Sequence, residues 1–396
     1  MYDVIVSGAG PGGACAAREC AQLGLSTLLL EKGQLPRLKC CAGGLLQRAL
    51  NHLNLRLPDD IVQRQIMGFA VEVGAQREEF SFSRRVGVTV RRAQFDHFLA
   101  KQAVSAGAEL MSGTATKEVC EHKDRVEVET EAGVFQARIL IVAEGVSSRT
   151  ARKLFGPFPP LALATGMAAN VSTERDPGDR IELHLIDTPT KGLHWDRFPL
   201  NGWMFPHRDG ANIGIVGQGC SRERLDASMH AIAEKLEARC GPVVTLDRSA
   251  HPLPFRPRPR LHSVRSMAVG DSAGFVNPIT GEGMGYAFLS AHLAARTARA
   301  VVDTESVRAL KLYDRSCQEQ ILRDLRAAAL IGPVLHWLVG VVDAPRFFGR
   351  FKEDRALVEV CAGIARGEAD WRHLARLAGP RFPRLFFSSL EPVRTS

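Results

Sequence analysis

Two adjacent cysteines, Cys40 and Cys41, stand ahead of a glycine pair in the stretch KCCAGGLL. Their spacing is not that of a zinc site, and the nine cysteines of the chain form no pattern of paired ligands. A thiol in an apolar pocket can hold and release a proton, because its pKa depends on its surroundings. Gly43 and Gly44 would let the backbone approach a flat ring closely. We therefore predict a catalytic loop at Cys41, Gly43 and Gly44, with Cys40 structural; simple packing is the alternative for Cys41.

The start of the chain has the residue types of a phosphate-binding turn. A strand is expected at 2–7, and GAGPGG follows it and fits G-x-G-x-x-G. Gly8 permits the tight turn, Gly10 lets the backbone approach a pyrophosphate, and Gly13 lets helix and strand pack closely. A helix expected at 12–23 directs free N–H groups at the phosphates, and a second strand at 26–30 ends at Glu31, which can accept hydrogen bonds from a ribose diol. The pattern predicts a dinucleotide site rather than an ordinary glycine-rich turn, with these residues: Gly8, Gly10, Gly12, Gly13, Glu31 and Lys32.

A later stretch, GDSAGFVNPITGEGMGYAF, favours a flavin dinucleotide over a nicotinamide one. Asp271 can accept hydrogen bonds from ribitol hydroxyl groups, and Gly270 precedes it. A helix that begins near Gly283 would point the positive end of its dipole at the flavin ring, where reduction leaves negative charge. A plain turn is the alternative for the Gly-Asp pair. The predicted FAD contacts here are Gly270, Asp271, Gly281, Gly283 and Met284.

Two shorter pieces agree with FAD. Arg92 stands just before an amphipathic helix and could reach the FAD phosphates, although a solvated charge at a helix start is its alternative. A buried strand expected at 139–143 leads into Glu144 and Gly145. The four pieces, in this order, resemble the flavoprotein fold shared by p-hydroxybenzoate hydroxylase, halogenases and geranylgeranyl reductases. Gly145 and Arg149 match that group's motif, whereas Glu144 stands where the group usually has aspartate.

The cysteine loop separates the branches of this group. Cys41-Ala42-Gly43-Gly44-Leu45 resembles a loop of the geranylgeranyl reductase family, and the stretch 270–288 is similar to that family's flavin loop. The resemblance implies an FAD-dependent enzyme that reduces carbon–carbon double bonds of isoprenoid chains on a lipid, a quinone, a tetrapyrrole or a diphosphate. It implies hydride transfer from reduced flavin, with Cys41 as a possible source of the proton. The electron donor stays open between NAD(P)H and ferredoxin, a redox donor protein.

Between 155 and 255 the sequence changes to short strands and turns. RIELHLI alternates apolar and polar residues, and NGWMFPHRDGANIGIVG reads as a hairpin that turns near Asp209. This texture predicts a sheet over the flavin with a cavity between them. Trp203, Phe205 and Pro206 are the predicted substrate contacts, in a segment that is similar to the family's aromatic-x-Phe-Pro stretch; core packing is their alternative.

These patterns predict an α/β protein with three parts. A Rossmann-like FAD-binding domain is expected from 1–70, 90–155 and 256–305, an antiparallel β-sheet substrate domain from 71–89 and 156–255, and a helical C-terminal region from 306–396. The apolar run 327–342 has 16 residues and is broken by Gly332 and Pro333, so it is a poor membrane span. It could line a tunnel for an apolar substrate, lie at a membrane surface, or form a buried helix pair.

The composition and net charge limit the kinds of binding partner that are expected. The 396 residues are 45% hydrophobic and 24% charged, as in globular proteins. Scattered cysteines and the lack of a signal-like start predict a cytoplasmic protein, with a peripheral membrane position as a further expectation. The net charge of +8 suits a phosphorylated substrate or an anionic membrane. The arginines form no dense run, so no nucleic-acid partner is predicted, and no metal is predicted either.

Two other functions compete with the reductase. An FAD-dependent aromatic hydroxylase or halogenase would keep the cofactor and activate oxygen. A halogenase should carry a Trp-x-Trp-x-x-Pro-like segment, but the stretch around Trp203 lacks the first tryptophan, and Lys191 is only a loose candidate for its lysine. The third hypothesis is a flavin-binding protein without catalytic activity.

Overall fold

The computed structural model describes residues 1–74, 76–186, 199–342 and 344–389, and its first sheet forms around the strand that opens the chain. β1 (Tyr2–Ser7) pairs in parallel with β2 (Thr27–Glu31) on one side and with β11 (Gly133–Val142) on the other. The paired segments are apolar because neither face of this part of the sheet meets water. The strand order is β8-β2-β1-β11-β10-β9, and β17 pairs with β11. The remaining strands of this sheet are β8 (Glu109–Ser112), β9 (Glu118–Glu121), β10 (Val126–Thr130) and β17 (Ser266–Ala268).

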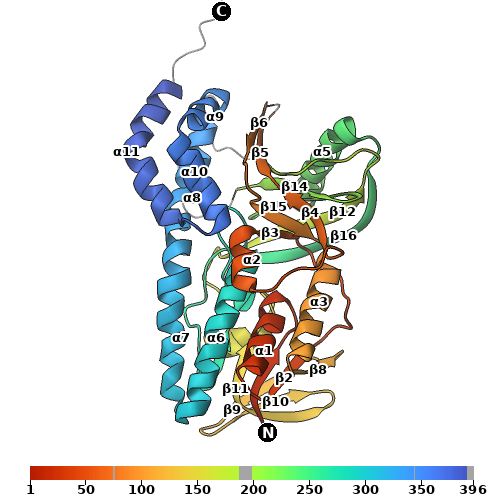
Figure 1. The fold of residues 1–396 in the computed structure, drawn as a ribbon, viewed down its shortest axis with the longest axis vertical. Helices are drawn as coiled ribbons and strands as arrows, with labels where there is room; N and C mark the ends of the chain where they lie inside the picture. The colour runs from red at the N-terminus through yellow and green to blue at the C-terminus, as the bar shows by residue number, and fades with distance from the viewer. Residues whose placement is uncertain (75, 187–198, 343, 390–396) are drawn as a thin grey trace, which may run out of the picture.

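A helix follows the first strand after a turn of three residues, 8–10. α1 (Pro11–Gln22) begins at a proline, which suits the first helical position because the N–H group that proline lacks would have no helical partner there. α1 packs between α3 (Arg92–Ser105) and α6 (Met284–Thr304), as Figure 1 shows. Its alanine-rich face lies against fully buried strand residues such as Leu29, and each such side chain stabilises the fold by about 1.5–3 kcal/mol. The predicted strand–helix–strand unit is confirmed.

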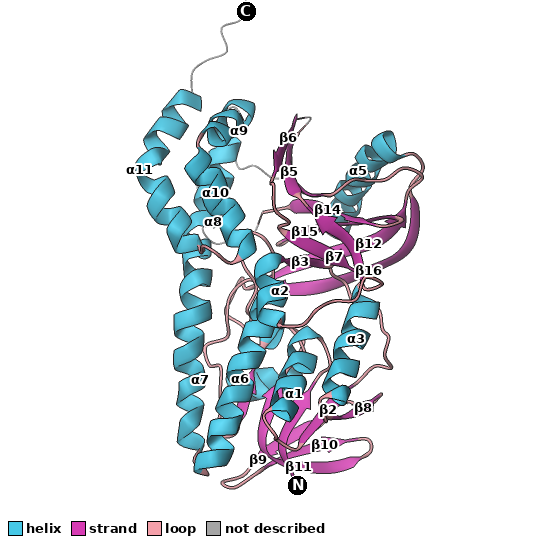
Figure 2. Ribbon diagram, in the orientation of Figure 1, coloured by secondary structure: helices cyan, strands magenta, loops and turns pink. Residues whose placement is uncertain are grey.

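The second sheet has the order β16-β12-β15-β14-β13-β5-β6 (Figure 2). The hairpin predicted around Asp209 is present as two antiparallel strands. Among the described strands of this sheet, β13 and β5 form the one parallel pair, because β5 enters the sheet from a distant part of the chain and not through a hairpin. α5 (Arg222–Cys240) covers one face of the sheet with an apolar core. The strands are β5 (Gly68–Val73), β6 (Gln76–Ser81), β12 (Leu163–Ser172), β13 (Arg180–Leu185), β14 (Asn201–His207), β15 (Gly210–Gly217) and β16 (Val244–Pro254).

A small third sheet lies between these two parts of the molecule. β7 (Gly87–Val90) is its middle strand, with β3 (Gly44–Leu46) and β4 (Val62–Ile66) on its two sides. β3 directly follows the cysteine loop, so the pairing of β3 with β7 holds one end of that loop. The short helix α2 (Gln47–Leu53) packs against β3 and β7, whereas the short helix α4 (Arg149–Phe155) packs against β17 of the first sheet.

The C-terminal part of the described chain is helical, as predicted. Its last four helices lie beside β5 and β6 at one end of the molecule (Figure 1). The Phe80 ring of β6 meets Phe348 and Phe351 at centroid distances of 6.3 and 6.0 Å. None of the described helices combines the length and the apolar character that crossing a membrane requires. The helices are α7 (Leu310–Cys317), a π-helical turn (Gln318–Leu322), α8 (Arg323–Val341), α9 (Ala344–Glu353), α10 (Arg355–Arg366) and α11 (Trp371–Ser389).

A buried histidine at the end of β14 makes the stability of the fold depend on pH. Burial and the charge of Arg91 lower the pKa of His207 from 6.5 to about 4, although Asp209 and Asp247 oppose this shift. The unfolded chain therefore binds a proton between pH 6.5 and 4 that the folded chain refuses, so stability is lost as the pH falls through this window. The full effect of this pKa difference is on the order of 3 kcal/mol.

We expect His207→Leu to flatten this dependence. Denaturant unfolding at pH 7 and pH 5 measures it, because the native protein should lose more free energy of unfolding between the two values than the variant does. His230→Leu is the matched control, since the His230 side chain is 76% exposed on α5. An unchanged slope in His207→Leu would assign the pH dependence to other groups.

Candidate functional site

One large cavity of about 1610 Å³ runs from the start of α1, between the first two sheets, to the C-terminal helices. Its volume exceeds the ~300–1,000 Å³ of a site for one small ligand, so it has room for two. The end near α1 is polar and glycine-rich, whereas the far end is lined by aliphatic and phenylalanine side chains. Almost all of the predicted site residues line this single cavity.

The polar end begins at the glycine turn between β1 and α1. Gly8 has φ +103°, and a Cβ atom there would lie 2.5 Å from the Ala143 carbonyl oxygen, so only glycine fits. Gly10 is the N-cap of α1 and makes no side-chain cap, which leaves the first N–H groups of the helix free for a ligand. Gly8, Gly10 and Gly12 line the cavity. Gly13 does not; it lies where α1 touches the turn, the packing position predicted for it.

Glu31 lies at the end of β2 in a network of hydrogen bonds. Its two carboxylate oxygens accept from the N–H groups of Ala9 (2.9 Å) and Gly33 (3.0 Å) and from the Arg37 guanidinium (3.1 and 3.2 Å). Burial alone would raise the pKa of Glu31, but the Arg37 contacts together with the Gly33 and Ala9 N–H groups outweigh it, and the net pKa is lowered. Glu31 is therefore ionised and can accept from a ligand hydroxyl group, while Lys32 lines the cavity next to it.

Arg92 is buried at the start of α3 and is paired with a carboxylate. It donates to both oxygens of Asp96 at 2.7 and 2.8 Å, and Arg37 contacts the same carboxylate at 3.2 Å. Burial by itself would lower the pKa of Arg92, but Asp96 and Cys41 raise it by more, so the net pKa is raised. Arg92 thus stays charged and lines the cavity, as the prediction of a phosphate contact requires.

The loop before α6 forms the opposite wall. The Gly270 N–H group donates to Ser290 Oγ at 3.1 Å, and the Asn277 carboxamide oxygen accepts from two N–H groups of the loop at 2.9 and 3.1 Å. Burial raises the pKa of Asp271, with Lys39 and Arg92 opposing this shift. α6 begins after Gly283 without a side-chain cap, so its N-terminus is open toward the cavity. All five predicted contacts of this stretch, from Gly270 to Met284, line the cavity.

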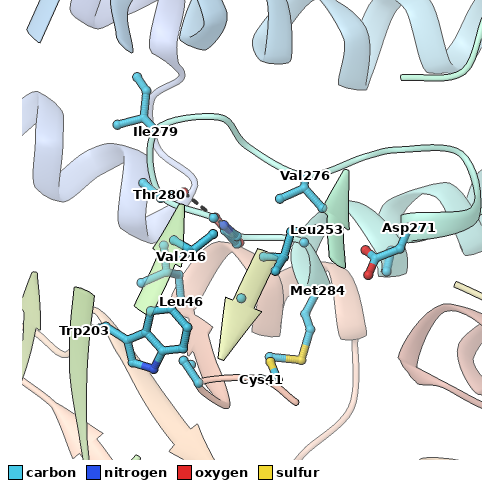
Figure 3. A pocket seen from close by; sticks show the side chains of 18 of the residues that line it. Cys41, Leu46, Trp203, Val216, Leu253, Asp271, Val276, Ile279, Thr280 and Met284 are labelled. Carbon is cyan, nitrogen blue, oxygen red and sulfur yellow. Dashed lines mark hydrogen bonds between the residues drawn. The ribbon is translucent and has the colours of Figure 1, made fainter. Parts of the chain in front are cut away.

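The cysteine loop lies between the two sheets, and its glycines are explained by packing. A Cβ atom at Gly43 would lie 2.0 Å from the Val90 carbonyl oxygen, and one at Gly44 would lie 2.3 Å from the Phe205 ring. Gly44 lines the cavity, whereas Gly43 is turned to β7 and does not. Cys41 Sγ accepts from the Gly43 N–H group at 3.4 Å. Figure 3 shows Cys41 on the cavity wall in the same view as Leu46, Trp203 and Met284.

Cys40 and Cys41 face different surroundings. The Cys40 thiol donates to the Ser249 carbonyl oxygen of β16 at 3.5 Å, and burial raises its pKa. Its neighbour Lys39 contacts His251 of the same strand. These contacts join the loop to the second sheet, in keeping with the structural role predicted for Cys40.

The turn after β11 holds its glutamate firmly. Glu144 accepts from the hydroxyl groups of Ser7 and Ser148, both at 2.7 Å. Gly145 has φ +82°, and its N–H group donates to Ser272 Oγ at 2.8 Å. The longer side chain at 144 is thus accommodated by two hydroxyl donors, and both Glu144 and Gly145 line the cavity.

The three predicted substrate residues of β14 lie on opposite faces of the strand, because successive side chains of a strand alternate in direction. Trp203 and Phe205 line the cavity, and Pro206 lies on the other face of the strand. The Pro206 carbonyl oxygen accepts from Thr89 Oγ1 at 2.6 Å, which ties β14 to the third sheet. Lys191, the loose halogenase candidate, lies outside the described residues.

Several cavity residues were missed by the sequence reasoning. Arg37, Lys39 and His251 line the polar part, and Asn201 and His336 line the apolar part. Their only sequence signal was the pair of basic residues just before Cys40. His251 and His336 come from strands and helices far along the chain, so no local pattern places them near the loop.

A buried ionic cluster lies outside the cavity. Ligand atoms of Glu72, Glu182 and His184 lie within 4.8 Å of one another, a spacing that a metal ion could use. However, Lys235 contacts Glu72 at 2.6 Å and Arg239 contacts Glu182 at 2.6 and 2.7 Å. The carboxylates are already neutralised by these cations, so the cluster is an ion-pair network between α5 and the sheet.

The polar end fits FAD on these observations: two open helix N-termini, a glycine cradle, an ionised Glu31 and several cations. A family model described as an FAD binding domain matches residues 1–328. The chain is 30% identical over 365 residues to digeranylgeranylglycerophospholipid reductase 1 of Methanopyrus kandleri, covering 84% of this chain and 90% of that protein.

Solved structures show the same fold. A geranylgeranyl bacteriochlorophyll reductase-like protein of Thermoplasma acidophilum superposes with a TM-score of 0.78 at 20% identity, over 97% of each chain. A flavin-dependent brominase superposes with a TM-score of 0.76 at 22% identity, over 97% of this chain and 99% of that one. The cofactor is FAD, and the matched family model and the Methanopyrus relative together establish that this chain belongs to the geranylgeranyl reductase family of FAD-dependent oxidoreductases.

Proposed function

We propose that this protein reduces isoprenoid carbon–carbon double bonds in a prenyl chain carried by a lipid, a quinone, a tetrapyrrole or a diphosphate. One observation carries the proposal: the FAD end of the cavity continues into a long apolar part. Burial of a prenyl chain there is favoured by about 25 cal/mol for each Å² removed from water. The walls of this part include Phe69, Phe80, Ile181 and Leu183 of the second sheet, Phe82 just after β6, and Leu335, Phe347, Phe351, Ile364 and Leu374 of the C-terminal helices.

A single polar pair interrupts these apolar walls among the residues that the structure describes there. The Asn201 side chain contacts His336 Nε2 at 3.1 Å, and His336 Nδ1 contacts the Gly332 carbonyl oxygen at 3.2 Å. Burial lowers the pKa of His336, so the ring is neutral and both of its nitrogens are satisfied. The pair joins β14 to α8 without placing a charge beside an apolar ligand.

The chemistry needs a hydride and a proton for each double bond. Reduced FAD supplies the hydride when it is bound. Cys41 is our candidate for the proton, because its side chain lines the cavity and is held by the Gly43 N–H group and by contact with Arg92. Gly43 and Gly44 keep the loop pressed against β7 and Phe205, so they fix where the thiol lies.

The proposal is tested under anaerobic conditions. The protein is reduced with dithionite, geranylgeranyl diphosphate is added, and the flavin absorbance and the product mass are followed. Reoxidation of the flavin with products heavier by multiples of about 2 Da, the mass of a hydride plus a proton, supports alkene reduction. A flavin that stays reduced with every prenyl acceptor until oxygen is admitted would favour the hydroxylase or halogenase hypothesis.

Cys41→Ala is expected to keep FAD and to lower the turnover number by roughly 100-fold or more, since a positioned acid is lost while the loop glycines remain. Cys41→Ser keeps the size of the side chain and retains a weaker acid. Its turnover number should therefore fall between those of the native protein and Cys41→Ala. Cys40→Ala is the matched control, because Cys40 also lines the cavity but its thiol is already engaged by the Ser249 carbonyl oxygen of β16. Full turnover in Cys41→Ala would remove the thiol from the chemistry and leave the rest of the proposal intact.

We also propose that the helical end of the cavity takes its substrate at a membrane surface. Leu330 of α8 lines the cavity and is 66% exposed, and exposed Arg323 and Arg326 lie on the same helix. An apolar tip beside cations suits an anionic lipid surface. Co-sedimentation with anionic vesicles measures this, and a protein that stays in the supernatant would contradict it.

A further inference from the structure

A row of polar side chains crosses the second sheet beside the cavity. Asn212 of β15 stands opposite Asn170 of β12, and Asn170 stands opposite Asp247 of β16. We propose that these three residues, called here the amide relay, are positioning residues that hold the Trp203 indole in one orientation against the substrate. This inference rests on the proposed function, because it takes Trp203 to be part of the wall beside the reacting chain.

Hydrogen bonds run along the whole row. The Trp203 indole N–H group donates to Asn212 Oδ1 at 2.9 Å, and Asn212 Nδ2 donates to Asn170 Oδ1 at 3.0 Å. Asn170 Nδ2 then lies 3.0 Å from each carboxylate oxygen of Asp247. The row thus begins at a cavity wall residue and ends at a charged group on the half-exposed strand β16.

The two ends of the row dictate the orientation of each amide. An indole N–H group can only donate, and a carboxylate can only accept. Asn212 must therefore turn its oxygen toward Trp203, and Asn170 must turn its nitrogen toward Asp247. Each bond polarises the next, and the last one is strengthened by the charge of the carboxylate. The amide relay consequently has one arrangement that satisfies all of its members.

The surroundings of Trp203 leave the hydrogen bond to Asn212 to decide the orientation of the indole ring. A Cβ atom at Gly214 would lie 2.1 Å from Cζ2 of the indole, so the ring occupies the space over a strand position that has no side chain. The ring packs against an apolar cluster that includes Val216, Phe255 and Val276. Apolar contacts fix the plane of the ring, but they do not choose between the two ring flips about the Cβ–Cγ bond that share this plane, since they are not directional. The bond to Asn212, which is 3% exposed, selects the direction.

If the Trp203 indole adopts another orientation, the reacting part of the substrate is displaced, but the prenyl chain can still bind in the apolar part of the cavity. Small misplacements of reacting atoms lower the rate of the chemical step strongly, while the tail of the chain continues to bind. Loss of the amide relay should therefore lower kcat and change KM little. A merely structural role would instead lower the amount of folded protein and leave the kcat of the folded fraction unchanged.

The test uses the holoenzyme with geranylgeranyl diphosphate. We expect Asn212→Leu to lower kcat about tenfold with KM changed less than about twofold, as for a positioning effect. In a Trp203→Phe background the same change should have no further effect, because the group it positions is gone. Asp247→Asn keeps an acceptor for Asn170 and should retain most activity. Thr245→Ala, an exposed change on the same strand, is the matched control.

A second measurement is independent of turnover. The fluorescence contribution of Trp203, obtained by subtracting the spectrum of Trp203→Phe, should shift in Asn212→Leu and stay unchanged in Thr245→Ala. An unshifted spectrum, or an equal loss of kcat in the Trp203→Phe background, would overturn the amide relay. A protein that reduces no prenyl acceptor would overturn the proposed function, and the fluorescence would then still decide whether the relay orients the indole.

Discussion

Gly13→Ala is expected to abolish FAD binding, with an affinity loss of at least about 100-fold, or 2.7 kcal/mol. A Cβ atom at this position would lie 1.7 Å from the Gly8 carbonyl oxygen and 2.9 Å from Ala143 Cβ. The first of these neighbours is backbone of the turn itself, so it cannot move aside like a flexible side chain. α1 would have to shift away from β1, and its free N–H groups would no longer point at the phosphates.

The ratio of flavin to protein absorbance after purification measures this loss, and thermal unfolding of the apoprotein separates it from misfolding. Gly349→Ala is the matched control, because Gly349 also lies in a helix and the added Cβ would have no described atom within 4 Å apart from its chain neighbours and the backbone of its own helix. The control should keep its FAD. Full FAD occupancy in Gly13→Ala would show that α1 can move without loss of the phosphate contacts.

Arg48→Leu is expected to lower the free energy of unfolding by about 3–5 kcal/mol, the range found when one partner of a buried ion pair is removed. Arg48 contacts Glu282 at 2.8 Å and Asp324 at 3.4 Å, and its own side chain is 9% exposed. Burial raises the pKa of Glu282, and the charge of Arg48 opposes this. Without Arg48 two carboxylates would be left buried, and the Tyr286 hydroxyl, which donates to Asp324 at 2.7 Å, is the nearest remaining donor.

This network also joins three parts of the site, because Arg48 lies on α2, Glu282 on the flavin loop and Asp324 on α8. We therefore expect Arg48→Leu to lose FAD more readily as well. Denaturant unfolding in excess FAD measures stability, and adding Glu282→Gln should restore part of it. The control is Arg84→Leu, whose pair with Glu368 (3.0 Å) is largely exposed and should contribute less than about 1 kcal/mol. Equal losses in the two variants would show that burial does not decide the effect.

Local patterns were sufficient wherever a motif and its function lie in one continuous stretch. The glycine turn, Glu31 and the loop from Gly270 to Met284 were assigned from spacing alone, and their elements appear in the structure at nearly the expected bounds. The reason is physical: a strand, a tight turn and a helix N-terminus are specified by neighbours within a few residues. Membership in the family followed from the same stretches together with the cysteine loop.

The role of the paired glycines, Gly43 and Gly44, could not be predicted from local sequence patterns. Gly43 and Gly44 were predicted to admit a flat ring, but the atoms that exclude a side chain there belong to Val90 and Phe205. Both partners are far from the loop in sequence, and strand pairing of β3 with β7 brings Val90 into contact. Pro206 likewise follows two cavity residues in sequence, and strand alternation turns it to the opposite face.

The sequence by itself determined the cofactor, the family and the order of the elements, because each rests on short-range patterns of glycine, carboxylate and apolar residues. Only the tertiary structure decided which side chains line the cavity. Arg37 reaches Glu31 and Asp96 at once, His336 meets Asn201, and the amide relay crosses three strands. Apart from the local Arg37–Glu31 bond, these contacts join residues 42 to 135 positions apart. They exist because the packing of sheets and helices around one cavity brings distant segments within hydrogen-bonding distance.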